Sequence, residues 1–184
     1  GFARNWVCAH TPQDVGVALV LSGLFVLLSA KGLTWLADHP GHEAHILAIG
    51  LLLVAAALLY IELKPYPMDY LADGTLLVDP YKMKTDCYKA YGIMVGLLLG
   101  WYAEQRWLHF TVDGMVPVRA VRFAVGAGCA LALQKFGKAP LAAALGTNWG
   151  IFALHLLLLL FVVVLYPAVF TAVERRIPTH AATA

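Results

Sequence analysis

Charged residues are scarce in this sequence, and three long stretches contain none. Asp, Glu, Lys and Arg together make up 13% of its 184 residues, whereas 61% of the residues are apolar. The uncharged stretches cover residues 15–30, 46–61 and 139–173. Runs of this kind are typical of transmembrane helices, and the composition excludes an ordinary soluble domain. The lipid bilayer is therefore the first partner that the sequence implies.

Three further absences narrow the possible functions. The three cysteines, Cys8, Cys87 and Cys129, form no pattern of metal or disulfide spacing. A net charge of +2 without a basic and aromatic patch excludes nucleic acid as a partner. No secretory signal precedes the first apolar run, and the first residue is Gly rather than Met. We therefore expect the chain to begin within a longer protein.

Two shorter apolar segments, at about residues 90–103 and 119–134, add to the three long ones. Their flanking lysines and arginines would have to reach the membrane interfaces. The expected fold is thus an all-α, polytopic bundle of about five transmembrane helices. Between the second and third helices, residues 64–89 are rich in Pro, Tyr and Asp, which predicts an interfacial loop. Lys and Arg are equally numerous on the two faces, so charge does not decide the sidedness.

The opening stretch "ARNWVCAHTPQDV" leads into the first apolar run. Thr11 is a suitable N-cap, Pro12 suits the first helical position, and Asp14 falls in the first turn. Arg4, His10 and Asp14 have the spacing R-x5-H-x3-D beside this helix N-terminus, which favours an anion. Arg binds phosphate oxygens, a neutral imidazole can attack phosphorus, and a carboxylate can orient the imidazole. The equally weighted alternative is an interfacial Arg, a loop His and a capping Asp that merely meet at the membrane surface.

The same stretch resembles the third signature of the superfamily of type 2 phosphatidic acid phosphatases and vanadium haloperoxidases. That signature reads Ser-Arg, five residues, His, three residues, Asp. The resemblance implies that Arg4 contacts the phosphate, that His10 is the nucleophile that becomes a phosphohistidine, and that Asp14 orients His10. The family's Ser is Ala3 in this chain, so one hydroxyl that could bind the phosphate is missing.

The resemblance further implies the C-terminal part of an integral-membrane phosphatase that hydrolyses a lipid phosphate or diphosphate. It implies neither a metal nor another cofactor. The family's other two signatures, which lie upstream, do not occur in these residues, so we expect the fragment alone to be inactive. Residues 1–36 would then hold the third signature and the last core helix, and residues 37–184 a four-helix extension. The family also favours a bacterial plasma membrane, with the active face periplasmic or extracellular.

The stretches "GLLLGWYAEQRWLHF" and "ALHLLLLLFVVVLYPAVF" resemble, more loosely, the C-terminal extension of some bacterial members. The rival hypothesis is a non-enzymatic helical bundle, such as a transporter piece or an assembly partner. Gly92, Gly96 and Gly100 predict a face on which another helix packs closely, and residues 124–132 carry a similar, weaker face. Both hypotheses accommodate these faces. The identity of the lipid and the oligomeric state remain open at this level.

Several other polar residues have two interpretations. His39, His42 and His45 in "DHPGHEAH" suggest metal ligands, but Pro40 and Gly41 interrupt any shared helix, so a polar turn is favoured. His155 lies alone within the last long apolar run, where a packing role and a functional role are equally supported.

Charged residues also flank the connection after the third helix. Glu104 and Arg106, with Arg119 and Arg122 beyond it, predict an ion-paired hairpin, with a second anion site as the alternative. Pro167 is expected to kink or end the last helix.

Overall fold

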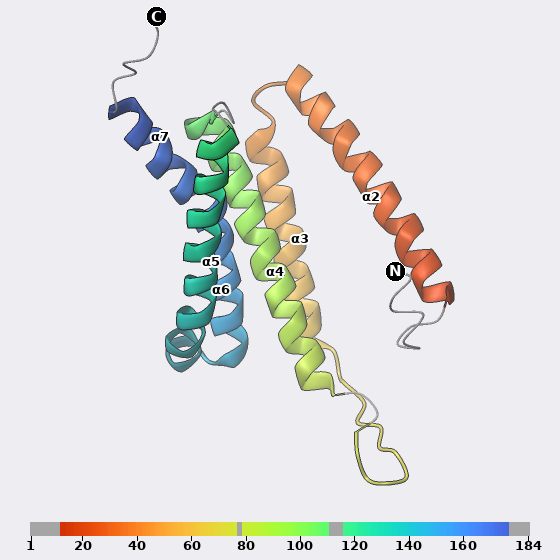
Figure 1. Ribbon diagram of the computed structural model, residues 1–184. Helices are drawn as coiled ribbons and strands as arrows, with labels where there is room; N and C mark the ends of the chain where they lie inside the picture. The colour runs from red at the N-terminus through yellow and green to blue at the C-terminus, as the bar shows by residue number, and fades with distance from the viewer. Residues whose placement is uncertain (1–11, 77–78, 111–115, 177–184) are drawn as a thin grey trace, which may run out of the picture. The chain divides into compact units, whose positions relative to one another are not determined.

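The computed structural model describes residues 12–76, 79–110 and 116–176, with side chains as far as residue 172 (Figure 1). Nearly all of this part of the chain is helical, and it contains no strand, which confirms the all-α class. The helical elements, in chain order, are α2 (Pro12–Asp38), α3 (Glu43–Leu63), α4 (Pro80–Ala103), η1 (Glu104–Leu108), α5 (Val116–Leu145), α6 (Thr147–Leu160), η2 (Phe161–Leu165) and α7 (Tyr166–Arg176).

Four helical segments are long and apolar enough to cross a membrane, and α4 is a fifth helix, which packs against α6. They are Gln13–Asp38, Glu43–Leu63, Val116–Leu145 and Thr147–Ala172. The predicted transmembrane bundle of about five helices is therefore confirmed. The chain divides into two compact units, Gly1–His45 and Ile46–Ala184.

The first unit contains α2 and the turn that follows it. Pro12 occupies the first position of α2 and Asp14 its first turn, as the opening stretch predicts. The turn after α2 is the polar turn expected from "DHPGHEAH". Nδ1 of His39 lies 2.8 Å from the carbonyl oxygen of Trp35, and the two rings stack with centroids 4.5 Å apart. Among the described residues, no group of three or more His, Cys, Asp or Glu side chains is arranged to hold a metal ion.

The loop between α3 and α4 is shorter than the sequence suggested. It was expected to extend to residue 89, but α4 begins at Pro80. The reason is a strong helix start: the carboxylate of Asp79 accepts hydrogen bonds from the backbone N–H groups of Tyr81 and Lys82, at 2.9 and 3.2 Å. The charged residues 82–89 therefore form the first turns of a helix instead of a loop.

In the second unit, α6 lies against both α4 and α5 (Figure 1). The predicted glycine face of α4 is the surface that α6 approaches. A β-carbon at Gly96 would lie 2.7 Å from Cβ of Leu159, and one at Gly100 would lie 3.0 Å from Cβ of Val163. The weaker face expected on α5 does not pack in this way, because a β-carbon at Gly128 would meet nothing within 4 Å. The close approach of α5 to α6 lies elsewhere, because a β-carbon at Gly150 of α6 would lie 2.7 Å from Cα of Ala142 in α5.

The boundary between the last two long helices also differs from the expectation. The uncharged run from residue 139 was expected to be one helix, but residues 139–145 complete α5, with Pro140 inside it. The break comes at Gly146, whose φ of 79° is readily adopted only by glycine. The π-helical turn η2 precedes Pro167, and α7 then continues in a new direction (Figure 1). The expected kink near Pro167 is therefore present.

Candidate functional site

The opening signature is described only in part. Arg4 and His10 lie outside the described residues, whereas Asp14 lies in the first turn of α2. Since α2 begins at Pro12, His10 comes two residues before the helix N-terminus along the chain. The signature therefore leads directly into a long apolar helix, as the resemblance requires.

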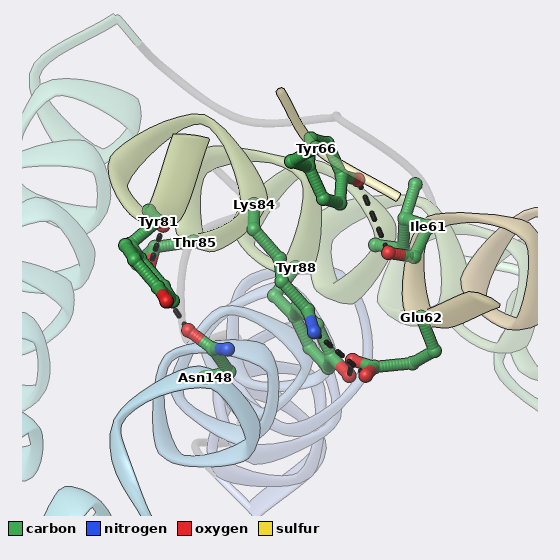
Figure 2. Close-up of polar contacts among 8 residues, drawn as sticks. All are labelled: Ile61, Glu62, Tyr66, Tyr81, Lys84, Thr85, Tyr88 and Asn148. Atoms are coloured by element: carbon green, nitrogen blue, oxygen red, sulfur yellow. Dashed lines mark hydrogen bonds and ion pairs between the residues drawn. The ribbon is translucent and has the colours of Figure 1, made fainter. Parts of the chain in front are cut away.

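A cluster of polar side chains joins the end of α3 to the first turns of α4 (Figure 2). Nζ of Lys84 lies 2.6 Å from Oε2 of Glu62, and the hydroxyl of Tyr88 donates a hydrogen bond to Oε1 of the same carboxylate. Only 1% of Tyr88 is exposed, which makes it the most deeply buried large side chain of the described residues. Both oxygens of Glu62 are thus occupied. This arrangement fixes two helix ends rather than leaving a carboxylate ready for proton transfer.

A second polar contact ties α4 to α6 at the same end of these helices. Oγ1 of Thr85 lies 2.9 Å from the carbonyl oxygen of Tyr81 and 2.8 Å from Oδ1 of Asn148 (Figure 2). A hydroxyl has one proton to donate, so these two acceptors share it. The ring of Trp149 packs edge-on against Tyr88, with centroids 5.1 Å apart. Sequence reasoning missed this cluster, although Lys84 and Tyr88, four residues apart, lie on one helix face.

His155 has a clear partner for one of its ring nitrogens. Its Nδ1 lies 2.8 Å from the carbonyl oxygen of Ile151, one helical turn earlier, and the residue is 8% exposed. A carbonyl oxygen only accepts hydrogen bonds, so Nδ1 carries the proton. The side chain is therefore held by its own helix, and its Nε2 is left for another role.

Among the residues that the structure describes around η1, Glu104 forms no ion pair with Arg106, Arg119 or Arg122, as the expected hairpin would require. The Glu104 carboxylate accepts a hydrogen bond of 2.9 Å from Nε2 of Gln105, and the guanidinium of Arg122 lies 4.7 Å from the centre of the Phe170 ring. The hydroxyl of Tyr166 donates a 2.6 Å hydrogen bond to the carbonyl oxygen of Arg122. A largely apolar cavity of about 370 Å³ opens beside these rings, with Arg119 at its edge. Aromatic packing therefore holds α5 to α7.

These features define an integral membrane protein in which polar contacts join helix ends. Residues 88–176 match a family model described as PAP2 superfamily phosphatase, transmembrane extension. Residues 88–176 are therefore similar to the transmembrane extension of PAP2 superfamily phosphatases, which confirms the resemblance to that superfamily recognised in the opening stretch. This similarity supports phosphatase activity in general. No curated protein and no solved structure matches the chain.

Proposed function

We propose that the protein that contains this chain is a metal-independent phosphatase that hydrolyses a lipid phosphate or diphosphate through a phosphohistidine at His10. One observation supports the proposal above others: two separate parts of the chain point to the same superfamily. The R-x5-H-x3-D spacing occupies residues 4–14, and the family match covers residues 88–176. The match of residues 88–176 is independent of the short signature, so a chance similarity of the signature alone does not explain both.

In the proposed mechanism, a ring nitrogen of His10 attacks the phosphorus atom in line with the leaving oxygen. The phosphorus–nitrogen bond forms as the bond to the lipid oxygen breaks, and the leaving oxygen takes up a proton from water. Arg4 neutralises charge on the remaining phosphate oxygens. The carboxylate of Asp14 accepts a hydrogen bond from the N–H of the other ring nitrogen, which orients the imidazole and stabilises it once it is charged. Water then hydrolyses the phosphohistidine. The N-terminus of α2 adds the favourable end of a helix dipole.

A lipid substrate follows from where the signature lies in the chain. The helix that begins two residues after His10 is apolar on all sides, with a mean hydropathy of 2.0 over its most apolar 18 residues. Such a helix places its N-terminus at the surface of the bilayer, where lipid headgroups carry their phosphates. A water-soluble substrate would not require the signature to be attached to a membrane-spanning helix.

Turnover of lipid phosphates by the complete gene product tests this proposal. His10→Ala should lower kcat at least about a thousandfold, whereas Asp14→Asn should lower it roughly 10²- to 10⁴-fold and leave measurable activity. His45→Ala, at an exposed histidine in the first turn of α3, is the matched control and should behave as wild type. Full activity of the His10→Ala protein would refute the assignment. A wild-type protein that neither hydrolyses lipid phosphates nor binds vanadate would favour the non-enzymatic bundle.

A further inference from the structure

A small polar pocket lies among α4, α5 and α6, entirely within the second unit. It has a volume of about 190 Å³. Its polar lining comes from Thr85, Asp86 and Lys89 of α4, Gln134 and Lys138 of α5, and His155 of α6. Three helices thus direct polar side chains into one space in a unit that is otherwise largely apolar. His155 lies within the candidate membrane span Thr147–Ala172, where a buried ionisable side chain is costly and indicates a binding role.

His155 gives the pocket a buried polar atom that the protein does not use. Nδ1 donates to the carbonyl oxygen of Ile151, and no hydrogen bond to Nε2 is formed by the residues that the structure describes. The residue is more than nine-tenths buried and lines the pocket. An unpaired polar atom in such a place is destabilising unless a ligand or water satisfies it.

The charges around His155 favour an anion. Two lysine ammonium groups, of Lys89 and Lys138, line the pocket against the single carboxylate of Asp86. Within the described part of the chain, neither lysine has a carboxylate oxygen within 4 Å, whereas Lys84 is paired with Glu62 outside the pocket. The pocket therefore keeps an excess positive charge and unpaired donors on two different helices. Phosphate oxygens complement such donors.

The size and position of the pocket restrict the ligand further. At about 190 Å³ it is smaller than the roughly 300–1,000 Å³ of sites that enclose whole drug-sized ligands, so it suits a headgroup rather than an acyl chain. His155 comes eight residues after Thr147, the first residue of α6, or roughly 12 Å along the helix axis. This depth places the pocket just inside one membrane interface. We propose that this pocket binds the phosphate of an anionic lipid headgroup whose chains stay in the surrounding bilayer.

This inference goes beyond the proposed function, because the pocket shares no residue with the opening signature. It assigns a lipid-binding role to the extension, whereas the proposed hydrolysis depends on His10. A lipid held there would anchor α4, α5 and α6 to one another through its phosphate. Lipid retention can be measured on a protein that does not turn over, so the two proposals fail independently.

The test is native mass spectrometry of the complete gene product carrying His10→Ala, transferred from vesicles of phosphatidylcholine with one-tenth phosphatidic acid. The wild-type pocket should retain phosphatidic acid. The double variant Lys89→Gln/Lys138→Gln should retain about tenfold less, because two charge-assisted contacts are lost. Lys135→Gln is the matched control: this lysine is exposed on α5, lies 5.7 Å from the Phe136 ring centre, and does not line the pocket. It should retain phosphatidic acid as the parent does.

Two further experiments test the role of His155 and the source of the phosphate. His155→Asn keeps an amide donor near the position of Nδ1 but removes Nε2, and it should also reduce retention. Because His155 is buried, the thermal unfolding of this variant is recorded in parallel. If it does not fold, the variants of the exposed lysines decide whether the pocket binds the lipid. Equal retention by the lysine double variant and by Lys135→Gln would overturn the proposal. The last experiment adds inorganic phosphate at the same concentration as the lipid. Displacement of the lipid would show that the pocket binds free phosphate rather than a lipid headgroup, and it would overturn the proposal.

Discussion

Gly96 of α4 lies directly against Leu159 of α6, so closely that a β-carbon on the glycine would be 2.7 Å from that of the leucine. The same β-carbon would lie 2.9 Å from the carbonyl oxygen of Leu156. In a bilayer, helices associate through such van der Waals contact because lipid is as apolar as the side chains. This contact therefore carries much of the stability of the second unit.

Gly96→Ala should lower the free energy of unfolding by about 1–3 kcal/mol, because the new methyl group forces the two helices apart. Gly128→Ala on α5 is the matched control, since nothing lies within 4 Å of its added carbon. It should be neutral or stabilising by up to about 1 kcal/mol, because Ala favours helix. Thermal unfolding in detergent measures both. Equal effects of the two substitutions would contradict the close packing of α4 on α6.

Tyr88 offers a test of the polar cluster. Tyr88→Phe keeps the buried ring but removes the hydrogen bond to Glu62, and it should lower the free energy of unfolding by about 1 kcal/mol. Tyr88→Ala should lower it by about 3–5 kcal/mol, because a large buried ring is lost as well. Tyr81→Phe is the control, since Tyr81 is 68% exposed. A Tyr88→Phe protein as stable as wild type would show that this hydrogen bond does not contribute to stability.

Asp73 in the loop before α4 should titrate at unusually low pH. The hydroxyl of Thr75 donates a 2.6 Å hydrogen bond to Oδ1 of Asp73, its backbone N–H donates another of 3.0 Å, and both lower the pKa from its ordinary value of 3.8. Ionised Asp73 therefore favours the folded loop above pH 3.8, and this contribution is lost as the pH falls through the lowered pKa.

Thr75→Val removes the hydroxyl but keeps the branched side chain and the backbone donor. The pKa of Asp73 should then rise toward 3.8, which carboxyl-carbon NMR of labelled protein can follow. A pKa of Asp73 that stays the same in Thr75→Val would assign the shift to the backbone donor.

The sequence predicted the membrane helices well because the bilayer demands long apolar runs. It predicted the α4 face as well, because Gly92, Gly96 and Gly100 recur every fourth residue. Two boundaries were wrong for local reasons. Asp79 caps α4 earlier than composition suggests, and Gly146 rather than the charge at Lys138 separates α5 from α6.

Contacts between distant residues were harder to anticipate. Glu62 and Tyr88 are 26 residues apart, and their meeting depends on how α3 and α4 pack. His155 was singled out from sequence as an isolated intramembrane histidine, but its neighbours Lys89 and Lys138 lie on other helices. The pattern of a single sequence indicates which face of a helix packs or binds. It does not identify the residues of other helices that this face contacts.

The most direct test of the central claim is to trap the covalent intermediate on His10. The complete gene product is mixed with a lipid phosphate labelled in its phosphoryl group and is quenched within one turnover; the labelled residue is then mapped. We predict a label that is stable to alkali, labile to acid, located at His10 and absent from His10→Ala. A label on another residue would contradict the phosphohistidine mechanism. So would a His10→Ala protein that still turns over the substrate and still becomes labelled.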